Sequence, residues 1–140
     1  MLYEDKISLS KVRLQTATSC LEDSRALIES GGYKSAVNRS YYAVFHAMRA
    51  VLALDSFDSK KHSGIISEFR KNYIKTQIFD YDMSRIIGDQ FDARSHSDYD
   101  DFYVLSKDFA VNQLEEAETA VGKIEKYLTE IYSNAPNQAE

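Results

Sequence analysis

Hydrophobic residues in the first part of the chain recur mainly at intervals of three, four and seven, the spacing of one face of an α-helix. The first series is Ile7, Leu14, Ala17, Leu21 and Ile28, and the second is Val37, Tyr41, Val44, Met48 and Val51. The two series predict helices at about residues 8–30 and 33–54. Gly31 and Gly32 separate them, and glycine readily adopts the left-handed conformation of a tight connection. The two helices should therefore form an antiparallel hairpin.

Helical spacing continues in the second part of the chain. Ile65, Ile66, Phe69 and Tyr73 predict a helix that begins near residue 60 or 61, and Met83, Ile87 and Phe91 predict a shorter one at residues 81–94. Gly88 interrupts this shorter helix and weakens it. The longest series, which predicts a final helix ending near residue 132, is Leu114, Ala117, Val121, Ile124, Leu128 and Ile131.

The segment before the final helix is polar. Ser97 and Asp98 are residue types that cap helix N-termini, so one of them should cap the last helix. Asp100 and Asp101 would then lie at the positive end of that helix, where carboxylates are favourable. We expect no strands, and four or five helices in one all-α, up-and-down bundle.

Domain organisation follows from length and composition. A chain of 140 residues is long enough to bury a core without disulfides or metal. Residues 1–132 should form a single helical domain. Residues 133–140 contain the one proline and no large hydrophobic residue, so we expect a disordered tail.

Charge and hydrophobicity narrow the classes of function. The net charge is −5 and the sequence pI is about 5.2, so the molecule as a whole does not attract nucleic acid, and any RNA contact needs a local basic patch. We expect no DNA partner. We expect no signal peptide and no membrane-spanning run. With one cysteine, Cys20, in a hydrophobic helical pattern, these features favour a cytoplasmic protein.

Metal and cofactor chemistry is not expected. The three histidines, His46, His62 and His96, lie on three segments without a carboxylate at metal-ligand spacing. The Glu-x-x-His pair of di-iron bundles is absent, as are phosphate-binding glycine loops and nucleophile elbows. We therefore expect neither metal nor cofactor.

A polar stripe on the second predicted helix is the main candidate for a functional surface. Asn38, Tyr42 and Arg49 share a face with Phe45, and Arg39 and His46 stand two turns apart, about 10 Å. One interpretation is a buried polar network that ties this helix to Arg94 and Asp98 or Asp100. The other is one wall of a ligand or RNA site, and the two are compatible.

The remaining polar residues have simpler interpretations. His46 is expected to be an interior histidine, His62 to cap its helix or lie exposed, and His96 to face solvent. The most basic stretch, which should form a solvated face, contains Lys60, Lys61, Arg70, Lys71 and Lys75.

Three blocks together resemble the HEPN domain family, in particular its small stand-alone prokaryotic members. They are residues 38–52 (NRSYYAVFHAMRAVL), 61–69 (KHSGIISEF) and 94–100 (RSHSDYD), in the family's order. The resemblance covers nearly the whole chain apart from the tail. It implies an all-α bundle that often forms a homodimer and partners a minimal nucleotidyltransferase, as in toxin–antitoxin pairs.

The resemblance also implies a chemistry. Active members of the family are metal-independent endoribonucleases with an arginine, four to six residues, and then a histidine. The arginine would hold the scissile phosphate, and the histidine would transfer a proton from or to the ribose oxygens. Here the corresponding positions after Arg94 hold Tyr99, Asp100 and Asp101, and the nearby histidine, His96, is two residues away. Arg39 and His46 have the spacing, but in the second predicted helix.

Three hypotheses follow. The first is a binding module that holds a nucleotidyltransferase partner, and nucleotide or RNA, in a polar groove. The groove residues are Asn38, Arg39, Tyr42, His46, Arg49, Asp98 and Tyr99, together with Arg94. The second is a ribonuclease toxin that uses Arg94 with His96 or His46 as catalytic residues. The third is a purely structural dimerisation bundle.

Overall fold

The computed structural model describes residues 2–102 and 104–134. Within these residues the protein is an all-α bundle without strands. Its helices are α1 (Tyr3–Glu29), α2 (Tyr33–Ala53), α3 (His62–Phe69), α4 (Tyr81–Tyr99) and α5 (Lys107–Ser133), and a π-helical turn, η1 (Arg70–Ile74), continues α3. The predicted fold class is confirmed.

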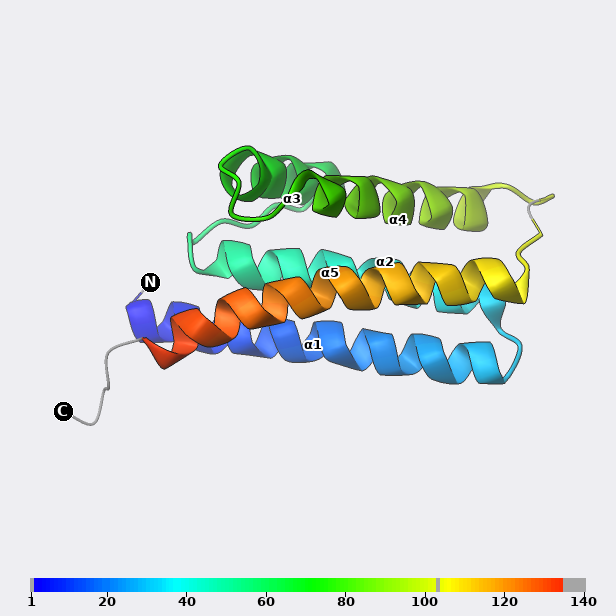
Figure 1. The fold of residues 1–140 in the computed structure, drawn as a ribbon, viewed down its shortest axis with the longest axis horizontal. Helices are drawn as coiled ribbons and strands as arrows, with labels where there is room; N and C mark the ends of the chain where they lie inside the picture. Colours follow the sequence, from blue (N-terminus) through cyan, green and yellow to red (C-terminus); the bar gives the residue numbers. More distant parts are fainter. Residues whose placement is uncertain (1, 103, 135–140) are drawn as a thin grey trace.

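Helices α1 and α2 form the predicted antiparallel hairpin. Gly31 adopts φ of 85°, the left-handed conformation that glycine tolerates best. Helix α5 runs beside this hairpin, and α3 and α4 lie across α2 from α1 (Figure 1). Because α2 packs against α1, α3, α4 and α5, it is the central helix of the bundle.

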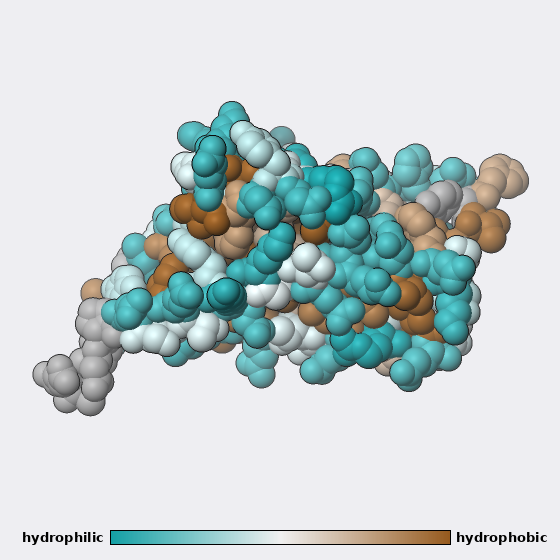
Figure 2. Space-filling model, in the orientation of Figure 1, coloured by the Kyte–Doolittle hydropathy of each residue, from teal (hydrophilic) through white to brown (hydrophobic). Residues whose placement is uncertain are grey.

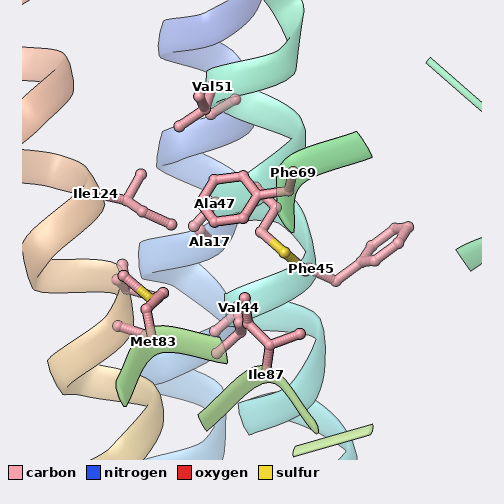
Figure 3. Close-up of a cluster of buried hydrophobic side chains, with 14 of the residues drawn as sticks. Ala17, Val44, Phe45, Ala47, Val51, Phe69, Met83, Ile87 and Ile124 are labelled. Carbon is pink, nitrogen blue, oxygen red and sulfur yellow. The ribbon is translucent and has the colours of Figure 1, made fainter. Parts of the chain in front are cut away.

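The hydrophobic seam of α2 forms the middle of the core. Val37, Tyr41, Val44, Met48 and Val51 are each at most 1% exposed, as their spacing predicted. Around this seam, the other helices contribute Ala17, Phe69, Met83, Ile87 and Ile124, seen in part in Figure 3. Burying one such large side chain stabilises the fold by about 1.5–3 kcal/mol, so the positions of α3, α4 and α5 all depend on α2.

Buried hydroxyl groups also join α1 to α2. Ser10 Oγ donates to the carbonyl oxygen of Ala50 at 2.7 Å, and Ser24 Oγ donates to that of Ala36 at 2.9 Å. Ser24 and Ser40 hydroxyls lie 2.8 Å apart. These contacts satisfy polar groups that would otherwise be costly to bury, and they fix the register of the hairpin.

The predicted boundary between the last two helices is wrong. Helix α4 continues to Tyr99, five residues beyond the predicted end at residue 94. Ser97 and Asp98 therefore lie inside α4 instead of capping α5. Asp98 pairs with Arg94 one turn earlier, which stabilises the helical conformation, and Ser97 is fully buried inside the bundle.

The true cap of α5 lies farther along the chain. Ser106 Oγ accepts a hydrogen bond from the Phe109 backbone N–H at 3.0 Å. Asp100 is the C-cap residue of α4, so it and Asp101 do not lie at the start of α5. Asp108 occupies the first turn of α5 instead.

The other boundaries agree more closely with the prediction. Helix α1 begins at Tyr3, five residues before the predicted start at residue 8. Helix α5 ends at Ser133, the first residue of the predicted tail. Residues 135–140 of that tail lie outside the described residues. No helix in the described parts of the chain is long and apolar enough to cross a membrane.

Candidate functional site

Two guanidinium groups lie close to the ring of Tyr42. The Cζ atoms of Arg39 and Arg94 lie 5.1 Å and 5.6 Å from the ring centroid, within the range of cation–π attraction. Arg94 Nη2 also donates to the Tyr42 hydroxyl at 3.3 Å. Arg94 Cζ lies 5.4 Å from the ring of Tyr41. Tyr42 thus holds one arginine of α2 and one of α4 near each other.

The two arginines differ in how their charges are compensated. Arg94 Nε lies 2.8 Å from Asp98 Oδ2, so a carboxylate neutralises much of the Arg94 charge. Arg39 Nη2 donates at 2.8 Å to Asn38 Oδ1, which is a neutral acceptor. Asn38, Arg39 and Asp98 help line a hollow of about 310 Å³. The predicted contact between α2 and the Arg94–Asp98 segment is therefore present.

His62 lies at the edge of the same cluster. Its ring centroid is 4.2 Å from that of Phe45, and its Nδ1 lies 2.9 Å from the Tyr41 hydroxyl oxygen. Burial lowers the pKa of His62 below 6.5, and the positive charges of Arg94 and Arg49 lower it further. At neutral pH the imidazole is uncharged.

The predicted role of His62 was wrong. His62 is the first residue of α3 and is half-buried, and the N-cap residue is Lys61, without a side-chain capping bond. Gly64 explains the tight approach of the preceding loop, because a Cβ atom there would lie 2.5 Å from Ser59 Oγ. The signal that could have identified His62 is its place in the block Lys61-His62-Ser63-Gly64.

His46 is half-buried on the adjoining part of α2. Its ring centroid is 5.9 Å from that of Tyr42 and 5.6 Å from that of Phe45. Burial lowers the pKa of His46 to about 4, with additional effects from Arg49, Arg39 and other positive groups. The position of His46 agrees with the prediction of an interior histidine. Its imidazole is neutral and lies close to several cations.

Arg49 extends the cluster toward the loop after α2. Its Nη2 lies 2.9 Å from Asp58 Oδ2, and Arg13 of α1 reaches the same oxygen at 3.2 Å. The hydrogen bond from Arg49 lowers the pKa of Asp58. We call the surface made by Arg39, Tyr42, His46, Arg49, His62 and Arg94 the arginine–histidine face.

Two predicted site residues lie apart from this face. His96 is exposed on α4. Residues two apart on a helix do not share a face, so the side chains of His96 and Arg94 lie on different faces of α4. Tyr99 is 77% exposed at the end of α4. Thus the structure brings Asn38, Arg39, Tyr42, His46, Arg94 and Asp98 into one region, adds His62, and separates His96 and Tyr99 from them.

A sequence model described as the HEPN domain matches residues 10–133. The chain belongs to the HEPN domain family. This match covers α2–α5 and most of α1, so it includes all residues of the arginine–histidine face.

Several named proteins are similar to this HEPN protein. "Putative toxin MJ0142" of Methanocaldococcus jannaschii is 33% identical over 115 residues, which cover 82% of this chain and 78% of that protein. "Putative toxin MJ0605" of the same organism is 31% identical over 118 residues, covering 84% and 87%. A "UPF0332 protein" of Archaeoglobus fulgidus is 34% identical over 113 residues, covering 81% and 90%. The HEPN protein therefore has relatives that are named as toxins.

The chemistry of the face is that of anion recognition. Guanidinium groups bind phosphate in a bidentate manner, and Tyr and His rings offer surfaces on which bases stack. Among the described residues of this HEPN protein, no group of three or more His, Cys, Asp or Glu side chains is placed to hold a metal ion.

Proposed function

We propose that this HEPN protein is the toxin-type member of a toxin–antitoxin pair and that its arginine–histidine face binds RNA. The observation that carries the proposal is the placement of Arg39 and Arg94 beside the ring of Tyr42, next to His46 and His62. Arg39, whose hydrogen-bond partner Asn38 is neutral, supports the proposal as a local positive charge, which an RNA contact needs in a chain of net charge −5.

The face suits single-stranded RNA better than a duplex. Arg39 and Arg94 would hold phosphate groups, and the rings of Tyr42 and His62 would stack with unpaired bases. Because phosphate contacts carry little sequence information, binding should depend more on salt than on sequence. This chemistry requires no metal.

The proposal includes a protein partner, a minimal nucleotidyltransferase. Exposed hydrophobic side chains at the end of α4 and in the connection to α5 support it. Tyr99, Phe102 and Val104 are 77%, 93% and 90% exposed, and hydrophobic atoms are visible at that end of the molecule in Figure 2. Large apolar side chains that gather in one exposed region favour a protein contact. The HEPN protein itself is proposed to be a homodimer.

RNA binding is tested by fluorescence anisotropy with a short, unstructured, labelled RNA at low and physiological salt. Arg39→Ala should weaken binding by about five- to twentyfold and make the salt dependence shallower, because a phosphate contact is lost. Arg25→Ala is the matched control, since Arg25 is an exposed arginine on α1 paired with Glu118. Its affinity should equal that of the wild type.

Two outcomes would overturn the proposal. One is the absence of saturable binding at low salt. The other is equal loss of affinity in Arg39→Ala and Arg25→Ala, which would indicate nonspecific charge effects. If Arg39→Ala and Arg94→Ala lowered stability without altering binding, the structural dimerisation bundle would be the better interpretation.

A second candidate function is metal-independent RNA cleavage, which the neutral histidines favour. A neutral imidazole of His46 or His62 can accept the proton of a ribose 2′-hydroxyl, while arginines compensate the charge that develops on the phosphate. The 2′-oxygen would bond to phosphorus as the bond from phosphorus to the 5′-oxygen breaks, and the 5′-oxygen would take up a proton from water. The products would be a 2′,3′-cyclic phosphate and a 5′-hydroxyl.

Cleavage is tested with total RNA and tRNA in the presence of a chelator. Activity that is lost in Arg94→Ala and in one of His46→Ala, His62→Ala or His96→Ala would establish the enzyme and identify its proton-transfer residue. If the RNA stays intact at protein concentrations that saturate the binding assay, cleavage of these RNAs is excluded. The proposal that the face binds RNA would then stand without the cleavage activity.

A further inference from the structure

Asp58 lies in the connection between α2 and α3, residues 54–61, and contacts two arginines at once. Arg49 donates to both of its carboxylate oxygens, from Nε to Oδ1 at 3.3 Å and from Nη2 to Oδ2 at 2.9 Å. Arg13 of α1 donates from Nη2 to the same Oδ2 at 3.2 Å. One carboxylate therefore joins α1, α2 and the connection at the Arg49 end of the arginine–histidine face.

The charges of this group do not balance. Two guanidinium groups share one carboxylate, and among the described residues neither arginine has another acidic partner. Burial lowers the pKa of Arg13, and the positive charge of Arg49 lowers it further. The two cations are thus close enough to repel each other, and Asp58 is the anion that holds them together.

The arginines are held more firmly than the carboxylate. The side chains of Arg13 and Arg49 are 13% and 24% exposed, whereas that of Asp58 is 49% exposed. Arg13 Nη1 also donates to the backbone carbonyl oxygen of Arg49 at 3.2 Å, which fixes one arginine against the other. The anion is therefore the member of the group that can leave, and the two guanidinium groups stay arranged for another anion.

The connection itself permits such a movement. It contains a turn but no helix, and Ser56 adopts φ of 56°, an unfavourable conformation for a residue with a side chain. The Tyr73 hydroxyl donates to Asp55 Oδ2 at 2.7 Å and anchors the start of the connection. Asp58 follows that anchor by three residues, so its side chain can turn toward solvent while the bundle stays folded.

We propose that Asp58 is an autoinhibitory residue of the RNA site, whose carboxylate occupies an anion subsite formed by Arg13 and Arg49 until an RNA phosphate displaces it. This inference rests on the proposed RNA function of the face. Arg49 follows Arg39 by ten residues of α2, a rise of about 15 Å. The subsite therefore extends the face to a second phosphate of the same strand, and Asp58 weakens that contact by competing for it.

The test measures RNA affinity by fluorescence anisotropy with the same unstructured, labelled RNA that tests Arg39→Ala. Asp58→Asn replaces the carboxylate by a neutral amide of the same size and should bind RNA about three- to tenfold more tightly at low salt. The plot of log affinity against log salt should steepen by about 0.7, the value for one additional phosphate of a single strand. Glu118→Gln is the matched control, because it frees Arg25 on another part of the surface. Its RNA affinity should equal that of the wild type.

Double variants identify the cations through which Asp58 acts. Arg49→Ala/Asp58→Asn should bind RNA no more tightly than Arg49→Ala, because the gain requires the freed guanidinium. Arg13→Ala/Asp58→Asn should retain only part of the gain, since one of two arginines is lost. A general loosening of the connection would raise affinity in both double variants, so these measurements separate it from release of the arginines.

Three results would overturn this inference. They are unchanged RNA affinity in Asp58→Asn, an equal gain in Glu118→Gln, and a gain that persists in Arg49→Ala/Asp58→Asn. If Arg39→Ala weakened RNA binding and Asp58→Asn left it unchanged, the proposed RNA function would stand and the autoinhibitory role alone would fail. Absence of RNA binding in the wild type and in Asp58→Asn alike would exclude both.

Discussion

The hydroxyl oxygen of Tyr41 lies 2.9 Å from Nδ1 of His62. A side chain of the buried seam of α2 thus holds the first residue of α3, and the same tyrosine ring contacts Phe91 of α4. The core and the arginine–histidine face are joined at Tyr41. A substitution that removes its contact with His62 should therefore change the stability of the fold.

Tyr41→Phe should lower the free energy of unfolding by about 1 kcal/mol, because a partly buried hydrogen bond is lost while the ring remains packed. Urea denaturation followed by circular dichroism measures the change. Tyr81→Phe is the control, since Tyr81 is 70% exposed, and its effect should stay within about 0.5 kcal/mol. Equal midpoints for the two variants would mean that the Tyr41–His62 contact contributes nothing to stability.

Gly64→Ala should destabilise the protein. A Cβ atom at residue 64 would lie 2.5 Å from Ser59 Oγ and 3.0 Å from Ser59 Cβ, so the Ser59 side chain or the loop that carries it must shift. Gly122→Ala is the matched control on α5, where nothing lies within 4 Å of the added atom. There the better helix propensity of alanine should stabilise the fold by about 0.5–1 kcal/mol. Thermal unfolding should therefore shift in opposite directions.

A second substitution locates the cause. Adding Ser59→Gly to Gly64→Ala should recover most of the lost stability, because it removes the side-chain atoms that the new methyl group meets. No recovery would place the strain elsewhere in the loop.

Much of the fold was predictable because burial imposes a period on the sequence. Val37, Tyr41 and Val44 face the core at the helical spacing that burial requires, and Gly31 has the conformation that a hairpin connection uses. These are properties of one helix or one turn. Such properties can be inferred without knowledge of which other helix packs against the segment.

The end of α4 was not predictable from residue types alone. Ser97, Asp98 and Ser106 are all N-cap residues by type. The choice is decided by contacts inside the fold, namely the pairing of Asp98 with Arg94 and the burial of Ser97. A charge pair within α4 and the burial of Ser97 thus override the capping preference and extend the helix.

The candidate site was predicted in part for a similar reason. Arg39 and Tyr42 share one helix, and the resemblance drew attention to Arg94. The sequence predicts a capping or exposed role for His62, because its contacts with Tyr41 and Phe45 cross between two helices and leave no trace in the spacing. Helical periodicity predicts which residues share a face of one helix. It does not predict which residues of a neighbouring helix contact that face.

His46 should make stability depend on pH between about 4 and 6.5. Its pKa in the folded protein is about 4, against 6.5 in an unfolded chain. The unfolded state therefore binds more protons in this window, and stability is present above pH 6.5 and lost as the pH falls toward 4. Solvent screening of this half-buried group limits the effect to roughly 1–2 kcal/mol.

The measurement compares urea midpoints of the wild type and His46→Gln across this window. The variant should lose less stability than the wild type as the pH falls, because it has no imidazole to protonate at residue 46. His62→Gln should change the profile in the same direction, since the pKa of His62 is also lowered. If the urea midpoints of the wild type and His46→Gln depended on pH in the same way, this would contradict the lowered pKa of His46.

Asp98→Asn offers a gain-of-function test of the arginine–histidine face. The Asp98 carboxylate lies 2.8 Å from Arg94 Nε and compensates its charge. Replacing it with a neutral amide of the same size should free the guanidinium for phosphate, raise RNA affinity by about two- to fivefold and steepen the salt dependence. Stability should fall by about 1 kcal/mol or less, because the pair is partly exposed.

The double variant Arg94→Ala/Asp98→Asn distinguishes this mechanism from a general loss of negative charge. If Asp98 acts through Arg94, the gain in affinity should disappear when Arg94 is absent. Asp92→Asn, which removes one carboxylate elsewhere on α4, is the charge-matched control and should not raise RNA affinity comparably. A gain that persists without Arg94, or that Asp92→Asn reproduces, would mean that net charge and not the Arg94–Asp98 pair controls RNA binding.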